Sequence, residues 1–235
     1  QAPGIRQSPG AFTALKTRGP NLALLMPLVG RDDQLNLILE VINANYESRR
    51  GVDKGRLRFI AIPGHVRVGK TRLGMEVRTV MRKFIEKNSK RQNFATPVYI
   101  GIDLSSGQKF NDAVDPRVPA DSGLAGRLAD TALSEFNWIR ATHDDVAELD
   151  LVEIFTRIVE GALVGHADDA VVPIIIHFDE YGMYDAAMKK SRCGVDHPFR
   201  ALFLASRRVM RDSSAVGDRL RRLHESGRYF VVPVA

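Results

Sequence analysis

Apolar residues recur along the chain at two spacings, and each spacing predicts a different kind of element. Spacings of three and four residues predict a helix from Asp32 or Asp33 and another from Lys70. Similar patterns predict helices within residues 124–136, 146–159 and 216–224. The inward positions of the first two helices are Leu35, Ile38, Leu39, Ile42 and Tyr46, and then Leu73, Val77, Val80, Met81 and Phe84.

Short apolar runs between these helices predict strands. They are residues 57–62 (LRFIAI), 97–104 (PVYIGIDL), 171–178 (VVPIIIHF) and 229–234 (YFVVPV). Strands that alternate with helices indicate βαβ units, and the unbroken apolar run 171–178 is typical of a strand buried on both faces. We therefore expect a three-layer α/β/α fold with a mostly parallel sheet. Residues 108–122, which include Pro116 and Pro119, are expected to form a loop.

Length and composition suit one large α/β domain. The 235 residues are 44% hydrophobic and 26% charged, which is typical of a soluble globular protein, and no apolar run is long enough to span a bilayer. Residues 1–27 are expected to form an extended segment, and residues 28–235 the domain. The chain starts without Met and stops inside an apolar run, so we expect a fragment truncated at its C-terminus. The net charge of +6 is interpreted as a solvated surface, because the basic residues are spread among several helices.

The most informative motif begins where the strand 57–62 ends. It matches G-x-x-x-x-G-K-[ST], the phosphate-binding loop pattern. Glycines let the backbone curl around phosphate, and the following helix start supplies unpaired N–H groups. Lys70 would reach the β- and γ-phosphates, and the Thr71 hydroxyl would bind magnesium. The nucleotide-binding candidates are Gly64, His65, Val66, Arg67, Val68, Gly69, Lys70, Thr71 and the adjacent Arg72. The alternative is a glycine turn with an incidental Lys-Thr cap.

A second motif lies at the end of the strand 171–178, where Asp179 and Glu180 form an acidic pair. Open α/β sheets bind ligands at this edge. Asp179 is predicted to hold magnesium as a Walker B carboxylate, and Glu180 to act as the catalytic base that activates water. The alternative is an acidic pair that starts an ordinary loop. His177 is interpreted as a structural histidine.

The order of the elements adds a topological prediction. A strand candidate, residues 229–234, follows the acidic pair, which resembles the additional-strand, catalytic-glutamate division of P-loop ATPases. In that division, this strand lies beside the strand that leads into the phosphate loop. The polar residue that senses the γ-phosphate would be expected where the chain stops, so it is not assigned. Gly30 and Arg31 resemble the G-R-[DE] box that packs near adenine in AAA+-like and STAND-type ATPases; a turn glycine and a surface charge are the alternative.

The segments LVGRDDQL, PGHVRVGKT, PVYIGIDLSSG and IIIHFDEYG together resemble the NTPase domain of Crinkler effectors and retrotransposon-hot-spot proteins, from about Leu28 to the chain end. The resemblance implies a P-loop at Gly64–Thr71 and a Walker B pair at Asp179 and Glu180. It also implies a multidomain protein in which other domains would bind nucleic acid. For an effector, it implies secretion followed by transport to the nucleus of the host. Arg67 departs from the small residue usual at its position, which puts full activity in question.

These observations predict an intracellular, Mg²⁺-dependent ATPase in which Lys70 and Glu180 are catalytic and Thr71 and Asp179 hold the metal. Its nucleotide is expected to be ATP, although base preference is not fixed by the motifs. Three other functions stay open: a nucleotide-binding switch with negligible turnover, a basic nucleic-acid-binding module with accessory ATP binding, and a small-molecule kinase. Self-association is left open, and no membrane partner is expected.

Overall fold

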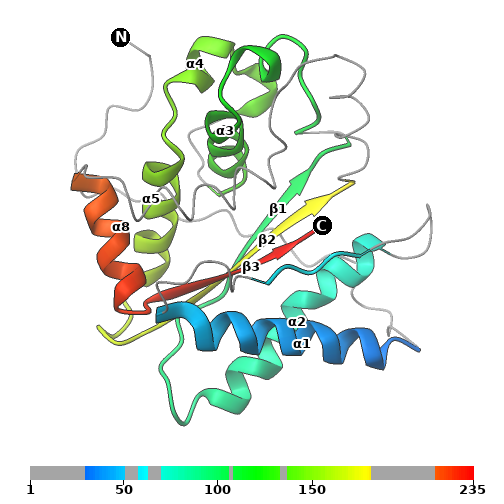
Figure 1. Cartoon of the computed structure of the whole chain (residues 1–235), viewed down its shortest axis with the longest axis vertical. Coiled ribbons are helices and arrows are strands. Elements are labelled where there is room, and N and C mark those ends of the chain that lie inside the picture. Colours follow the sequence, from blue (N-terminus) through cyan, green and yellow to red (C-terminus); the bar gives the residue numbers. More distant parts are fainter. Residues whose placement is uncertain (1–29, 51–57, 63–69, 106–107, 133–136, 181–214) are drawn as a thin grey trace. The chain divides into compact units, whose positions relative to one another are not determined.

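The computed structural model describes residues 30–50, 58–62, 70–105, 108–132, 137–180 and 215–235 (Figure 1). The chain divides into two compact units. The unit that contains the sheet, called here the sheet unit, comprises Thr17–Gly101, Ala162–Asp179 and Arg222–Ala235. The helical unit comprises Gln1–Lys16, Ile102–Gly161 and Glu180–Arg221.

Three strands form the sheet: β1 (Val98–Asp103), β2 (Val172–Asp179) and β3 (Tyr229–Val234). Their order is β1-β2-β3, and all three run in the same direction (Figure 1). Val172 of β2 is in register with Tyr229 of β3, and the pairing continues to His177 and Val234. The protein is therefore an α/β protein with a small parallel sheet, and the predicted strands 97–104, 171–178 and 229–234 are confirmed within one or two residues.

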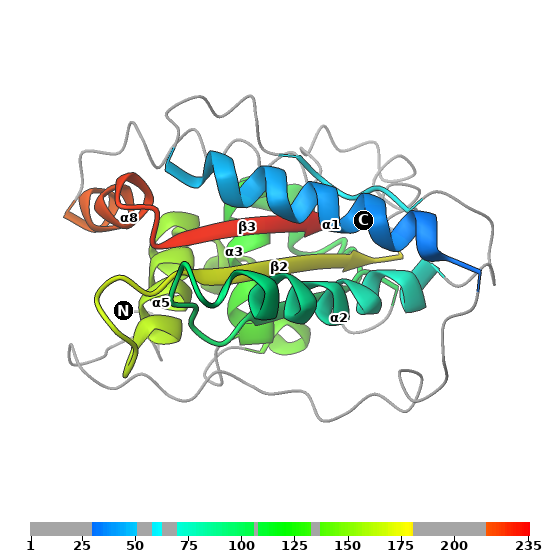
Figure 2. The same ribbon diagram turned by 90° about the horizontal axis from the view of Figure 1, so that it is seen from below.

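Two long helices, α1 (Asp32–Glu47) and α2 (Lys70–Asn88), lie side by side over one face of β2 and β3 (Figure 2). Both start where the sequence predicts. A single 3-10 turn, η2 (Ser48–Arg50), follows α1. The apolar stripe of each helix is turned inward, and Ile38, Ile42, Val77, Met81 and Phe84 are each at most 3% exposed.

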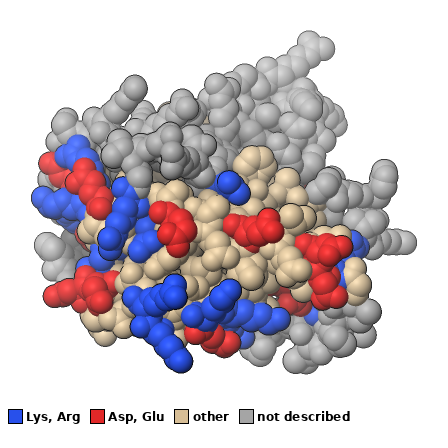
Figure 3. All heavy atoms as spheres, turned by 60° about the horizontal axis from the view of Figure 1, so that its bottom comes forward, with Lys and Arg blue, Asp and Glu red and all other residues tan. Residues whose placement is uncertain are grey.

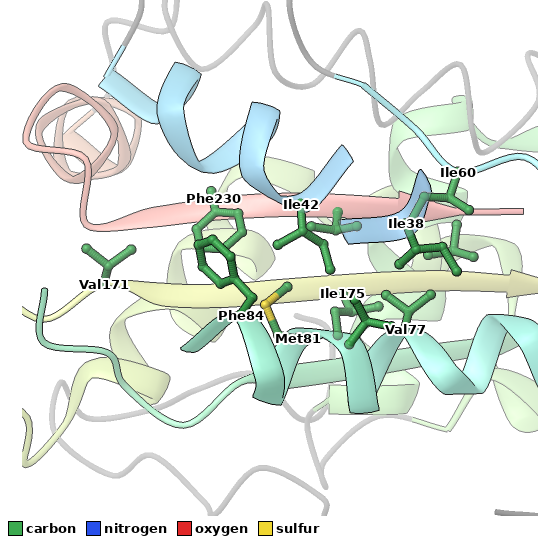
Figure 4. Packing of buried hydrophobic residues seen from close by; sticks show 12 residues of the cluster. Ile38, Ile42, Ile60, Val77, Met81, Phe84, Val171, Ile175 and Phe230 are labelled. Carbon is green, nitrogen blue, oxygen red and sulfur yellow. The ribbon is translucent and has the colours of Figure 1, made fainter. Parts of the chain in front are cut away.

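The core of the sheet unit lies between these helices and the sheet (Figure 4). Side chains of α1 and α2 meet Ile175 of β2 and Phe230 of β3. One end of this core is aromatic: the rings of Tyr46, Phe84 and Phe230 contact each other edge-on, with centroids 5.2–6.0 Å apart. Each buried side chain of this size stabilises the fold by about 1.5–3 kcal/mol, so the core fixes both helices on the sheet.

The segment that precedes the predicted phosphate loop lies on the other side of β3. Ile60 forms a parallel bridge with Val234, its N–H donates to the Pro233 carbonyl over 2.9 Å, and its carbonyl accepts from Ala235. β3 therefore lies between this segment and β2. The segment itself differs from prediction: among residues 58–62, the ladder is reduced to an isolated bridge at Ile60.

A proline and a buried asparagine explain why the ladder is short. In a parallel ladder, the N–H and carbonyl of one residue point to the same neighbour. The Pro233 carbonyl points to Ile60, but Pro233 has no N–H to offer the Arg58 carbonyl. Asn45 of α1, 2% exposed, replaces the missing pairing. Its Nδ2 donates to the carbonyls of Arg58 (2.8 Å) and Val231 (3.0 Å), and its Oδ1 accepts from the Arg58 N–H (2.8 Å).

The helical unit contains α3 (Ala120–Ala132), α4 (His143–Ala147) and two 3-10 turns, η4 (Asp115–Arg117) and η5 (Trp138–Arg140). Two helices, α5 (Leu151–Leu163) and α8 (Ala215–Glu225), begin in this unit and end in the sheet unit. On the outer surfaces of these two helices, Arg219 donates to both carboxylate oxygens of Glu160. The helix predicted within 216–224 is confirmed.

Two predictions for this region are wrong for identifiable reasons. The pattern 146–159 is two helices, because the Asp150 carboxylate accepts from the N–H groups of Val152 and Glu153 and so starts α5. The predicted loop 108–122 includes η4 and the start of α3. Arg127, fully buried, forms a two-pronged ion pair with Asp115 and donates to the Gln108 carbonyl, so this segment is tied to α3.

The N-terminal segment 1–27 and the phosphate-loop residues 64–69 lie outside the described residues. Among the helices that the structure describes, none combines the length and apolar character that crossing a bilayer requires.

The replacement of a ladder pairing by Asn45 makes a prediction about stability. Asn45→Ala leaves the Arg58 N–H and two carbonyls without partners, so the free energy of unfolding should fall by about 2–3 kcal/mol. Adding Pro233→Ala supplies the missing N–H, so the regular ladder can close and the double variant should recover part of this loss. Urea unfolding of the wild type, Asn45→Ala, Pro233→Ala and the double variant measures the coupling free energy between the two substitutions. Strictly additive losses would show that the proline is not the reason for the asparagine.

Candidate functional site

The two predicted motifs meet at a hydrogen bond. Thr71 lies in the first turn of α2, and Asp179 is the last residue of β2. The Thr71 hydroxyl Oγ1 donates to Oδ1 of Asp179 over 2.9 Å, although the two residues are 108 positions apart. Both belong to the sheet unit. The structure therefore brings the last residue of the phosphate-loop motif against the first acid of the second motif.

The backbone around Thr71 favours anions. The first four N–H groups of a helix have no partner within the helix, and the helix dipole places partial positive charge there. Residues 70–73 occupy this position in α2. The loop that precedes them, residues 63–69, lies outside the described residues, as does the side chain of Lys70. The phosphate roles of Gly64, His65, Val66, Arg67, Val68, Gly69 and Lys70 therefore stay predictions from the sequence.

Glu180 follows Asp179 with an unusual backbone conformation. Its φ is 55°, in the left-handed region that residues other than glycine seldom adopt. This conformation costs about 1 kcal/mol or more and is often found at functional sites. The turn ends β2 directly after Asp179, and the Glu180 side chain is half-buried. Its assignment as catalytic base stays a prediction.

Three other candidates have well-defined positions. Arg72 donates through Nε to Oε1 of Glu76 over 2.9 Å, within α2. Gly30 has a φ of 69°, which explains the choice of glycine before α1. Arg31 is the residue before the first turn of α1, and its carbonyl accepts from the Leu35 N–H. Nucleotide contacts of these three residues stay predictions.

His177 fixes the distance between α2 and β2. It is 4% exposed, and its Nδ1 is 2.5 Å from the Tyr99 hydroxyl of β1. Its other edge meets α2 at Gly74, where an added Cβ would come within 2.3 Å of Nε2. Burial lowers the pKa of His177, and the nearby Asp179 carboxylate partly offsets this effect. The interpretation of His177 as a structural residue is confirmed by these contacts.

Sequence reasoning missed Gly74 and Tyr99 as parts of this arrangement. Glycine inside a helix costs about 1 kcal/mol relative to alanine, so a glycine in α2 is itself a signal of close packing. Tyr99 gave no comparable signal, because a tyrosine in a strand is ordinary. It also carries the Arg78 guanidinium 4.8 Å above its ring. Together these residues place the first turn of α2 next to Asp179.

The Thr71–Asp179 pair fits a magnesium ion. Mg²⁺ prefers oxygen ligands and keeps several waters, so it is usually bound by one or two protein groups plus substrate phosphates. A hydroxyl and a carboxylate in contact supply that donor set. Across the part of the chain that the structure describes, no group of three or more His, Cys, Asp or Glu could hold a metal by itself.

Comparisons with known proteins give no match: no family profile, no curated protein and no solved structure matches the chain. Function must therefore be inferred from the residues and their geometry.

The contact between His177 and Gly74 predicts that Gly74→Ala changes the free energy of unfolding in opposite directions with and without the His177 ring. Gly74→Ala should lower the free energy of unfolding by about 1–2 kcal/mol, because the new methyl group meets the imidazole. In a His177→Ala background, the same change should instead raise it by up to about 1 kcal/mol, through helix propensity alone. Urea unfolding measures each pair within its own background. A change in the free energy of unfolding of equal sign and size in both backgrounds would show that the His177 ring does not limit how closely α2 approaches β2.

Proposed function

We propose that this protein binds ATP with magnesium and hydrolyses it at the junction of α2 and β2. The observation that carries the proposal is the hydrogen bond between Thr71 and Asp179. The sequence assigns these residues to two motifs that serve the same metal–phosphate group, and a phosphate site requires them to be neighbours. A chance motif would not require this contact.

The strand order gives independent support. β3 lies between the segment 58–62 and β2, which is the arrangement expected of an additional-strand, catalytic-glutamate P-loop domain. In such a domain, the strand before the phosphate loop and the strand before the acidic pair end at the same edge of the sheet. We therefore extend the observed α/β fold to the P-loop NTPase class as part of the proposal.

Each residue has a distinct role in the proposed reaction. The N–H groups at the start of α2, together with Lys70, bind the β- and γ-phosphates and stabilise the charge that develops during transfer. Glu180 accepts a proton from the water that attacks the γ-phosphorus, and the bond to the β–γ bridging oxygen breaks in line. The products are ADP and inorganic phosphate.

Thr71 and Asp179 would hold magnesium, which when bound neutralises phosphate charge and orients the phosphate chain. The Thr71 hydroxyl donates to the Asp179 carboxylate, which keeps both groups in place. His177 and Gly74 act on this pair indirectly, since they set how closely α2 approaches β2. They are positioning residues.

Phosphate release tests the assignment. The wild-type protein should release phosphate from ATP only with Mg²⁺, and Glu180→Gln should bind MgATP while turnover falls about 100-fold or more, because the base is lost. Lys70→Ala should abolish binding. The matched control is Glu148→Gln, which makes the same chemical change at an exposed residue of the helical unit and should leave the rate unchanged.

The outcome also separates hydrolysis from a binding switch. Equal, near-zero rates in wild type and Glu180→Gln, with intact MgATP binding in both, would contradict the enzyme and favour the switch. Unchanged affinity in Lys70→Ala would contradict the location of the site.

A further inference from the structure

Basic side chains are frequent in the second half of α2 and in the turn that follows it. Residues 78–91 carry six basic side chains and one acidic side chain, a net charge of +5. The six basic residues, named here the basic face, are Arg78, Arg82, Lys83, Lys87, Lys90 and Arg91.

The basic face lies on the outer side of α2 and on the turn that follows it. Arg82, Lys83, Lys87, Lys90 and Arg91 are exposed, and Glu86 is the acidic residue among them. Arg78 is half-buried, with its guanidinium over the Tyr99 ring. Figure 3 views the side where α1 and α2 lie, and Lys and Arg side chains gather along the lower edge of this view. The segment is about 20 Å long at the rise of a helix.

The neighbouring helix has the opposite charge. α1 carries Asp32, Asp33, Glu40 and Glu47 and has no basic residue between Asp32 and Glu47. Both helices cover the same side of the sheet (Figure 2). An anionic partner is therefore attracted to α2 and repelled from α1, which directs it along one helix.

The chemistry of the face favours nucleic acid over a lipid surface. A helix that binds a membrane inserts exposed apolar side chains into the lipid. The apolar side of α2 is buried instead, since Val77, Val80, Met81 and Phe84 are at most 5% exposed. The exposed side of α2 carries Lys and Arg side chains on a helix that the core holds against the sheet. Such side chains are the usual contacts to a phosphate backbone.

We propose that the basic face binds the phosphate backbone of duplex nucleic acid without sequence preference. The site goes beyond the proposed ATPase and does not depend on it, because its residues lie outside the Thr71–Asp179 pair. It places nucleic-acid binding, which the sequence left open as an alternative function, on named residues of this chain.

The test is fluorescence anisotropy of a labelled DNA duplex of about 20 base pairs, titrated with the full chain without nucleotide at ~50 mM to ~200 mM salt. Contacts from five or six basic residues predict a slope of log affinity against log salt of about −5. Arg82→Gln/Lys83→Gln/Lys87→Gln should weaken binding at least about 10-fold at low salt and reduce the slope to about −2.5. Glutamine preserves helix propensity, so the variant should keep the wild-type unfolding temperature.

The matched control is Lys109→Gln/Arg117→Gln/Arg140→Gln, which removes the same charge from exposed positions in the helical unit. It should leave the affinity and the slope close to wild type. The proposal is overturned if wild type fails to bind the duplex at low salt, or if both triple variants weaken binding equally. It is also overturned if vesicles of phosphatidylserine and phosphatidylcholine bind more tightly than the duplex.

Discussion

A hydroxyl and a carboxylate, brought together from opposite parts of the chain, define the candidate site. Thr71 donates to Asp179 because the first turn of α2 is held at the end of β2. Two features hold it there: the apolar core beneath α2, and the fit of His177 against Gly74, where no side chain larger than hydrogen is accommodated. The geometry of the proposed nucleotide site is thus set by the packing of His177 against Gly74, one turn further along α2.

The segment 58–62, which precedes the predicted phosphate loop, is held in place by polar contacts. Pro233 occupies an inner strand, where its missing N–H would ordinarily leave the Arg58 carbonyl unpaired. Asn45 supplies three hydrogen bonds to the two strands at this point. As a result, α1 is joined to this segment by polar contacts as well as apolar ones. Because this segment directly precedes the phosphate-loop motif, α1 supports the candidate site from outside it.

Much of this fold follows from periodicity, and the departures come from single polar side chains. The apolar stripes of α1 and α2 and the runs in β1, β2 and β3 predicted those elements, because burying them leaves few arrangements. Spacing could not show that Asn45 reaches residues 13 and 186 positions away, that Asp150 divides a helical pattern, or that Arg127 orders a loop. For the site, motif positions predicted that Thr71 and Asp179 would be neighbours. Gly74 and Tyr99 were missed, because their roles depend on which strand faces the helix.

The central claim is that the contact between Thr71 and Asp179 marks a metal–nucleotide site. Calorimetric titration with ATP, with magnesium and then with the metal chelated, tests it most directly in wild type, Thr71→Ala and Asp179→Asn. The account predicts that wild type binds MgATP more tightly than metal-free ATP, and that either substitution removes this difference. Equal affinity of wild type for both forms, or a magnesium effect that survives both substitutions, would contradict it.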